Sequence, residues 1–294
     1  MPGVRFALLA FAAVASAWAA EPVLSPPIGE LTTPGWSFEE LRRFPAPEAR
    51  QGVAVEGDFF FAIGNHVIGK YHKTTGERVA VWDGGEGGEV IHLNAGIVRS
   101  GRLYGVHSNY PGVPMLSSLE IFDPATLRPV GSHSFGRMDG SFTWLDRAPE
   151  SATGAAAGRW IACFVHYGNR GAEPNRDAAW TQIIALDDEW RRTAGWALPP
   201  ALIERFGGRG FSASGGAFGP GGLLYLTGHD NTELYALEFP QAGSVLRWVA
   251  TVPIPAEGQA FCWDPAEPGV LYTVLKRTRE VIVGRVRRPA VTQR

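Results

Sequence analysis

A segment of about 45 residues recurs along the chain with the same order of features, and this repeat limits the possible folds more than any other property of the sequence. Each copy opens with small polar residues and glycine, continues into a short apolar stretch, and turns at Gly or Asp. It returns through a second apolar stretch that ends at His, Asn or Lys. The copies open near Gln51, His92, Asp139, Ser214 and Glu257. Repeats of this length built from short strands are typical of β-propeller blades.

The apolar stretches predict an all-β fold, a five-bladed β-propeller with four-stranded blades. Four copies contain four candidate strands each, whereas the last copy ends one strand short, near residue 286. The segment 36–44 precedes the first copy and can supply that missing outer strand. We therefore expect the N-terminal strand to close the ring, which removes the free edge of the last blade. A β-sandwich is the main alternative, but it does not explain the recurring openings.

The third copy is longer than the others because of two polar insertions rich in Ala and Gly, at residues 147–158 and 168–179. A single helix is predicted over Pro199–Phe206, where proline stands at the start and Gly207-Gly208 follow the end.

The first 20 residues have the pattern of a secretory signal peptide, with Arg5, an apolar run over 6–15, and small residues before Ala20. The apolar run is too short to span a bilayer, although an N-terminal membrane anchor remains an alternative. We expect a signal peptide over 1–20, an extended linker over 21–35, a propeller domain over 36–289 and a C-terminal tail over 290–294. The mature protein is then expected to be periplasmic or secreted.

The composition fits an exported globular domain of 294 residues, 45% of them hydrophobic. A net charge of −2 gives no reason to expect nucleic acid or an anionic membrane as a partner. Cys163 and Cys262 lie in apolar runs of non-adjacent copies, so we expect two small buried side chains rather than a disulfide. We expect a monomer whose partner is a small molecule or a peptide.

Strand direction places the polar residues of the repeat on one face of the propeller. The innermost strand of a blade crosses to the other face and the second strand returns, so the start of the first and the end of the second share a face. The starts contain Gln51, His92, Asn94, Asp139, Ser141, Ser214, Glu257 and Gln259, and the ends contain Asn65, His66, His107, Asn109, Tyr110, His166, His229, Asp230 and Lys276. Five of the seven histidines fall on this face, which predicts a polar central funnel. The opposite turns contain Asp58, Arg102 and Asp264.

Histidine and glutamate near an axis suit acid/base chemistry, so Glu257, His107 and His166 are candidate catalytic groups, and the other funnel residues are candidates for substrate binding. The ordinary structural interpretation is that strand-end histidines bond to nearby backbone and that Glu257 pairs with Lys276 or Arg277. The sequence has no His-x-His or His-Glu-x-x-His motif, so the spacing does not support a metal and no cofactor is predicted; a metal bound in the funnel by residues of separate blades is the alternative. A Gly-x-Ser-x-Gly motif is also absent, which disfavours a serine hydrolase.

Two short motifs carry a resemblance to a known family. The opening Arg50-Gln51-Gly52-Val53 and the last copy, from Glu257 to Pro265 followed by Gly269–Tyr272, resemble the five-bladed propellers of plant and bacterial glutaminyl-peptide cyclotransferases. The chain is most similar to an exported sister group that is sometimes labelled cycloisomerase. The resemblance implies acid/base cyclisation of N-terminal glutamine. Gly258-Gln259 stand where that family has Asn-Gly.

Three function classes remain open from the sequence. The first is an acid/base enzyme, either cyclotransferase-like or a lactonase-like hydrolase. The second is a non-catalytic exported propeller that binds a small molecule or peptide in the funnel. The third is an interaction scaffold that uses tryptophans on its rim, namely Trp36, Trp180, Trp190 and Trp196.

Overall fold

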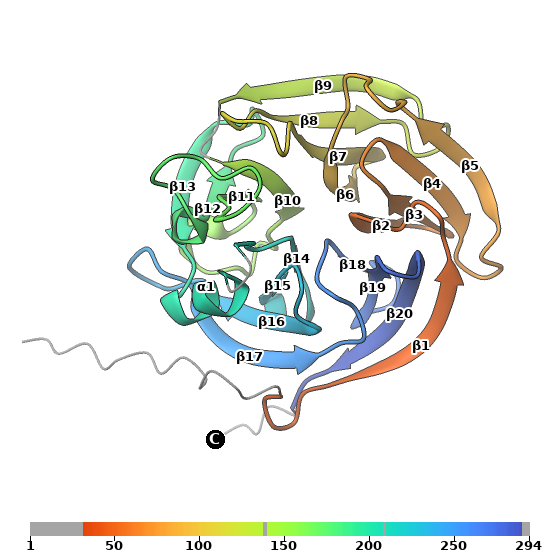
Figure 1. Ribbon diagram of the computed structural model, residues 1–294. Helices are drawn as coiled ribbons and strands as arrows, with labels where there is room; N and C mark the ends of the chain where they lie inside the picture. Colours follow the sequence, from red (N-terminus) through yellow and green to blue (C-terminus); the bar gives the residue numbers. More distant parts are fainter. Residues whose placement is uncertain (1–31, 138–139, 208–209, 290–294) are drawn as a thin grey trace, which may run out of the picture.

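The computed structural model describes residues 32–137, 140–207 and 210–289 (Figure 1). Five four-stranded antiparallel sheets surround one axis, which confirms the predicted five-bladed propeller. Blade 1 contains β2 (Gly52–Glu56), β3 (Phe59–Ile63), β4 (Val67–His72) and β5 (Arg78–Asp83). Blade 2 contains β6 (Leu93–Arg99), β7 (Arg102–Ser108), β8 (Ser117–Phe122) and β9 (Pro129–Gly136).

The remaining blades have the same order of strands from the axis outward. Blade 3 contains β10 (Ser141–Arg147), β11 (Trp160–Val165), β12 (Gln182–Leu186) and β13 (Arg192–Ala197). Blade 4 contains β14 (Gly215–Phe218), β15 (Leu224–Thr227), β16 (Glu233–Glu238) and β17 (Arg247–Pro253). Blade 5 contains β18 (Cys262–Trp263), β19 (Val270–Leu275), β20 (Glu280–Arg287) and, outermost, β1 (Ser37–Pro45).

The ring is closed by β1, as the sequence predicts. This strand runs antiparallel to β20, from the pair Ser37 and Arg287 to the pair Pro45 and Glu280 (Figure 1). Phe44 is buried in this closure, and its ring centroid lies 5.3 Å from that of Phe60 in blade 1. The closing strand therefore ties the last blade to the first by packing as well as by backbone hydrogen bonds.

The core lies between neighbouring blades, because each inner strand has a blade on both sides. Every residue of β11 is buried, whereas most residues of the outermost strand β5 are exposed. Phe142 and Phe164 stack in this core with ring centroids 4.7 Å apart. Cys163 and Cys262 are free and buried. Buried aliphatic and aromatic side chains on both faces of a strand explain why the inner strands have continuous apolar sequences.

The predicted helix is present as α1 (Pro200–Gly207) and packs on blade 4, where the ring of Phe206 meets that of Tyr235 at 5.1 Å. The two insertions of blade 3 contain short 3-10 turns, at Gly154–Ala156 and Ala178–Trp180. No helix in the described part of the chain is long and apolar enough to cross a bilayer.

The axial channel is nearly filled at the end opposite to the predicted funnel, where only about 20 Å³ remains open. Asp146, which is 1% exposed, accepts hydrogen bonds from Arg99 Nη2 at 2.8 Å and from the backbone nitrogen of Phe218 at 2.7 Å. This carboxylate links blades 2, 3 and 4. The ring of Trp144 fills the same region and leaves no room for a Cβ atom on Gly216, which would lie 2.4 Å away. The funnel therefore has a floor.

Candidate functional site

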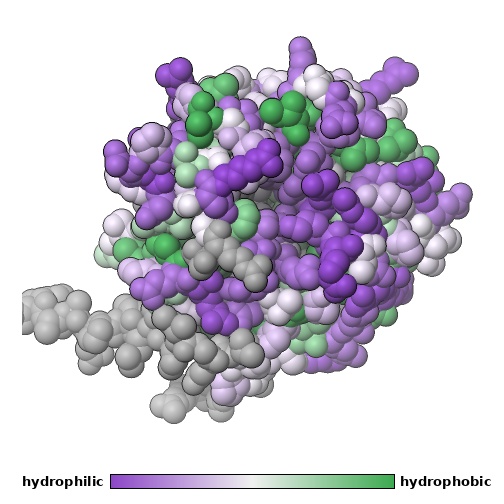
Figure 2. Space-filling view, viewed as in Figure 1, coloured by the Kyte–Doolittle hydropathy of each residue, from purple (hydrophilic) through white to green (hydrophobic). Residues whose placement is uncertain are grey.

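A cavity of about 480 Å³ opens on the face where the repeats begin. Its walls come from the residues that precede each first strand and follow each second strand, in all five blades. Eight of the predicted funnel residues line it, namely Gln51, His92, Asn94, Tyr110, Ser214, His229, Gln259 and Lys276. Figure 2 shows hydrophilic residues around the hollow at the centre of this face.

Hydrogen bonds cross all five interfaces between neighbouring blades at this end of the molecule. The bonds run from Leu93 N to Asn65 O (2.7 Å), Asn94 Nδ2 to Phe142 O (2.7 Å), Thr143 Oγ1 to Ala213 O (2.9 Å), Thr227 Oγ1 to Gln259 O (2.6 Å) and Ala260 N to Gln51 O (3.0 Å). Most of these groups are buried, where an unpaired polar atom is costly. The ring of bonds therefore fixes the strand starts and holds the cavity in one shape.

The approach of blade 5 to blade 4 requires glycine at one position. Gly258 has a φ of +63°, and a Cβ atom there would lie 2.1 Å from the carbonyl oxygen of Gly228. Gln259 follows with a φ of 68°, which is uncommon for a side chain other than glycine. This backbone conformation brings Gln259 into the cavity wall.

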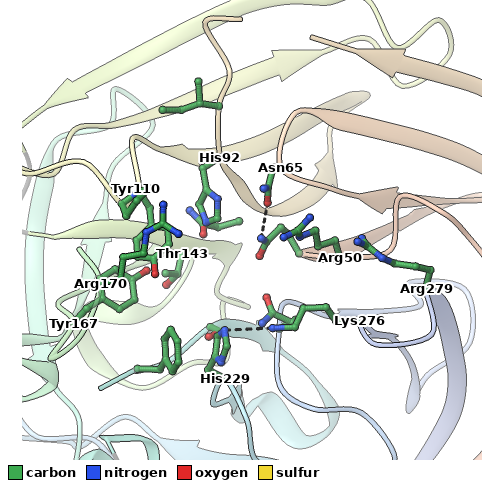
Figure 3. Close-up of a pocket in the computed structure, with 17 residues that line it drawn as sticks. Arg50, Asn65, His92, Tyr110, Thr143, Tyr167, Arg170, His229, Lys276 and Arg279 are labelled. Carbon is green, nitrogen blue, oxygen red and sulfur yellow. Dashed lines mark hydrogen bonds between the residues drawn. The ribbon is translucent and has the colours of Figure 1, made fainter. Parts of the chain in front are cut away.

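The cavity is strongly cationic. Arg50, Arg170, Lys276 and Arg279 line it together with two histidines, and no Asp or Glu is among the described lining residues. In Figure 3, Arg50 and Arg279 extend from one side of the cavity and Arg170 from the other. A concave site lined by charges of one sign concentrates ligands of the opposite sign. The electrostatic field of this cavity therefore favours an anion.

His229 is held on three sides. Its Nδ1 lies 2.7 Å from Asp230 Oδ1, and its ring stacks on Phe211 with centroids 3.6 Å apart and planes 11° from parallel. The carboxylate of Asp230 accepts the Nδ1 hydrogen, so Nε2 faces Lys276 Nζ at 3.5 Å as an acceptor (Figure 3). Burial lowers the pKa of Lys276, and the nearby Arg50 and Arg279 lower it further against the opposing effect of Asp230. This arrangement suits a lysine that exchanges its proton.

His92 stands on another wall of the cavity, with its ring centroid 5.0 Å from that of Tyr110. Burial lowers the pKa of His92 to about 4, and the neighbouring His107 and Arg50 act in the same direction. The ring is therefore neutral near pH 7. Burial also raises the pKa of Tyr110 and of Tyr167, so both hydroxyls keep their protons and can donate hydrogen bonds to a ligand.

The three candidate catalytic residues do not line the cavity. His107 uses both ring nitrogens locally, since Nδ1 lies 2.8 Å from Ser118 Oγ and Nε2 accepts from the backbone nitrogen of Ile91 at 3.1 Å. Buried His166 lies 3.0 Å from Glu173 Oε2 and borders a separate cavity of about 300 Å³. Glu257 is on the rim, where Oε1 accepts from Arg277 Nε at 3.4 Å. Its pairing with Arg277 is the structural interpretation given above.

The other predicted residues support the walls or fall outside the described chain. Asn109 braces its own loop, since its amide nitrogen donates to Pro114 O at 3.1 Å and its Oδ1 accepts from Leu116 N at 2.8 Å. Ser141 is buried and donates to Ser108 Oγ at 2.9 Å. Asp230 acts through His229, as described above. Asp139 lies outside the described residues.

Strand direction alone did not single out the three arginines of the cavity, nor Tyr167 and Phe211. Arg50 directly precedes Gln51, and Arg279 lies in the same turn as Lys276, so strand direction places both on this face. Arg170 belongs to the 168–179 insertion, for which the repeat gives no position. A count of charges flanking each strand start would have shown the excess of cations.

Within the described residues, no group of three His, Cys, Asp or Glu side chains has the arrangement of a metal site.

The rim tryptophans give little support to an interaction scaffold. Trp180 is 57% exposed, whereas Trp196 is buried and Trp36 and Trp190 are partly buried against the hydrophobic cores. Among these four residues the exposed indole of Trp180, at the end of the turn Ala178–Trp180, does not by itself form an apolar patch of the size expected at an interface.

Comparison with known proteins finds likeness in solved structures only. No protein-family model and no curated protein sequence matches this chain. The crystal structure of Myxococcus xanthus glutaminyl cyclase aligns with a TM-score of 0.56 at 10% identity, over 87% of this chain and 98% of that one. Hydrazine synthase of Kuenenia stuttgartiensis aligns over 81% of this chain and 70% of that one, with a TM-score of 0.45 at 14% identity. The Xanthomonas campestris gluconolactonase XC5397 aligns over 78% of this chain and 68% of that one, with a TM-score of 0.41 at 12% identity. At this identity the likeness to the glutaminyl cyclase shows a shared propeller fold, in line with the fold part of the resemblance seen in the sequence.

Proposed function

We propose that this protein is an exported propeller that binds a small organic anion, with at least one carboxylate group, in its central cavity. The observation that carries the proposal is that four cations line the cavity, while no Asp or Glu is among its described lining residues. The cations are Arg50, Arg170, Lys276 and Arg279. Guanidinium groups bind carboxylates through paired hydrogen bonds, which favours an organic acid. A volume of about 480 Å³ suits a small molecule or the end of a peptide.

Acid/base catalysis on the bound anion is the second candidate. It is favoured by His229, whose Nδ1 is bonded to Asp230 and whose Nε2 faces Lys276, and by His92, which is neutral near pH 7. A cyclotransferase-like reaction on N-terminal glutamine would place the amino group of the substrate among four cations, so that amine must be neutral when it binds. A lactonase-like reaction would start from a neutral ring and release an acid that these cations attract.

The remaining parts of the proposal come from the sequence. The signal-peptide pattern supports export to the periplasm or out of the cell, and the net charge of −2 supports a soluble partner other than nucleic acid. The closed ring of blades supports a monomer, and the missing metal motifs support function without a cofactor.

A thermal-shift panel tests the proposed function. The panel contains organic acids, their amides, an aldonolactone and a short peptide with N-terminal glutamine. We expect the acids to raise the melting temperature, the matching amides to have little effect, and Arg50→Gln to abolish most of the shift. Arg247→Gln is the control, because Arg247 is exposed on β17 and pairs with Glu238. Stabilisation by the lactone or the glutamine peptide, with none by acids, would replace the proposal by a lactonase-like or cyclotransferase-like activity.

A further inference from the structure

We propose that Lys276 is a nucleophile that forms an imine with the carbonyl group of an oxo acid held in the central cavity. The inference rests on the proposed function, because the cationic walls must first hold the carboxylate of the same molecule. It goes further in naming the substrate class, a carbonyl compound with a carboxylate, and the atom that reacts with it.

Lysine is rare in this chain, which makes its presence in the cavity informative. Of 27 Lys and Arg residues only three are lysines, at positions 70, 73 and 276. The Nζ of Lys70 donates to Pro124 O at 2.9 Å and lies 4.2 Å from the centre of the Phe59 ring. Lys73 forms an ion pair with the buried Asp264. Both side chains therefore have structural roles.

Lys276 has a different environment. It is half-buried in the cavity wall, and among the described residues no carboxylate lies within 4 Å of its Nζ. Its hydrogen-bond partner is the Nε2 acceptor of His229, at 3.5 Å. Burial is the largest cause that lowers the pKa of Lys276, Arg50 and Arg279 act in the same direction, and Asp230 and Glu257 oppose them. Desolvation and neighbouring cations increase the neutral, nucleophilic fraction of a lysine amine.

The carboxylate and the carbonyl of an oxo acid match the two parts of the site. In Figure 3, Lys276 lies between His229 and the pair Arg50 and Arg279. The arginines of this wall can bind the carboxylate, which brings the adjacent carbonyl carbon toward Nζ. Arg170 and the hydroxyls of Tyr110 and Tyr167 stand across the cavity and can bind a second polar group of the ligand.

The His229–Asp230 pair supplies the proton transfers that imine formation needs. The neutral amine of Lys276 adds to the carbonyl carbon, forming the N–C bond while the oxygen gains a proton from solvent. His229 Nε2 takes a proton from the nitrogen, and the carboxylate of Asp230 stabilises the resulting imidazolium through Nδ1. His229 then returns the proton to the hydroxyl group, which leaves as water when the C=N bond forms. The nitrogen keeps its last proton, so the net change is amine, carbonyl and one solvent proton to a protonated imine and water, without an oxidant or reductant.

Reductive trapping tests the imine directly. The full-length protein is incubated with pyruvate, 2-oxoglutarate or phenylpyruvate and sodium cyanoborohydride at neutral pH, then digested and analysed by mass spectrometry. With pyruvate we expect a carboxyethyl group on the peptide that contains Lys276 and little on the peptides of Lys70 and Lys73. Propionate, an anion without a carbonyl, should slow labelling by competition. Pyruvamide, which has the carbonyl without the charge, should label far more slowly.

Three variants separate the nucleophile from the general base. Lys276→Arg keeps the positive charge and should remove the adduct while anions still bind, and Lys276→Met should also remove it. His229→Asn should slow labelling at Lys276 by about 100-fold, since it removes the proton acceptor. Circular dichroism melting of each variant confirms that it is folded. Equal labelling of all three lysines, or unchanged labelling in His229→Asn, would overturn the proposal.

Calorimetry in parallel distinguishes this inference from the proposed function. If the oxo acids bind and none labels Lys276 preferentially, imine formation is wrong and the anion site stands. If neither the oxo acids nor propionate bind and no adduct forms, the proposed function fails as well.

Discussion

The imidazole of His229 lies flat on the ring of Phe211, with centroids 3.6 Å apart and planes 11° from parallel. The stack fixes the plane of the imidazole, and the 2.7 Å contact of Nδ1 with Asp230 fixes its rotation within that plane. Nε2 is consequently directed at Lys276 before any ligand arrives. Preorganisation of this kind reduces the reorganisation that a reaction in the cavity requires.

Replacing the stacked ring should loosen His229 without changing the charge of the cavity. An aromatic stack is worth about 1 kcal/mol beyond its buried area, so Phe211→Leu should slow trapping at Lys276 by about fivefold. The affinity for a non-reacting acid such as propionate should stay nearly constant, which calorimetry checks. A large loss of propionate binding would show instead that Phe211 shapes the anion site itself.

The buried neutral state of His92 should make stability depend on pH. The unfolded chain takes up a proton at this residue near pH 6.5, whereas His92 in the folded protein has a pKa of about 4 because of burial and of the nearby His107 and Arg50. Its contribution is therefore present above pH 6.5 and is lost as the pH falls toward 4. Acidification from pH 6.5 to pH 4 should therefore lower the free energy of unfolding by up to about 3 kcal/mol through His92.

Urea unfolding of the wild type and of His92→Gln from pH 4.5 to 7.5 measures this effect. The difference between the two proteins isolates His92 from other groups, including His107, whose pKa is also lowered by burial. The wild type should lose more stability on acidification than the variant does. Parallel curves would mean that His92 is protonated as readily in the folded protein as in the unfolded chain.

Closure of the ring by β1 should contribute to global stability. Phe44 is 8% exposed and packs on Phe60, so Phe44→Ala should lower the free energy of unfolding by about 3 kcal/mol. Leu41→Ala on the same strand is the matched control, because Leu41 is 40% exposed and should change stability by less than about 1 kcal/mol. Chemical denaturation measures both variants. Equal effects would show that the strand contributes through its backbone alone.

The floor of the cavity depends on a buried carboxylate that should be costly to remove. Asp146→Ala breaks the bonds to Arg99 and to the backbone of Phe218 and leaves both donors unpaired, so we expect a loss of about 3 kcal/mol. Asp188→Ala is the control, because the Asp188 side chain is 70% exposed and forms a surface ion pair with Arg147. It should lower the free energy of unfolding by less than about 1 kcal/mol. Denaturation curves that coincide for the two variants would contradict a structural role for Asp146.

The period of the repeat allowed the fold to be predicted in detail. Only pairing of segment 36–44 with the last blade completes five equal sheets, and the pairing of Phe44 with Val281 follows that expectation. Strand direction also placed His92, His229 and Lys276 around one cavity. First strands begin, and second strands end, on the same face of the propeller, and these residues lie at those positions.

The directions of the side chains could not be obtained in the same way. His107 lies at the end of β7 that faces the cavity side, as predicted. Its two ring nitrogens, however, contact Ser118 and the backbone of Ile91 rather than the cavity. Glu257 likewise lies next to the axis and pairs with Arg277 on the rim. Ser118 lies opposite His107 on β8, whereas Ile91 and Arg277 lie outside the strands, and the repeat pattern does not predict the direction of any of these contacts.

Calorimetric titration with an organic acid and its amide tests the central claim most directly, because the two ligands differ mainly in charge. The acid that gives the largest thermal shift should bind the wild-type protein, and the amide should bind weakly or not at all. Arg50→Gln should weaken binding of the acid by about 10-fold or more, the value of one hydrogen bond to a charged group, while Arg247→Gln leaves it unchanged. Equal affinities for acid and amide, or an affinity that Arg50→Gln does not alter, would contradict an anion site in the central cavity.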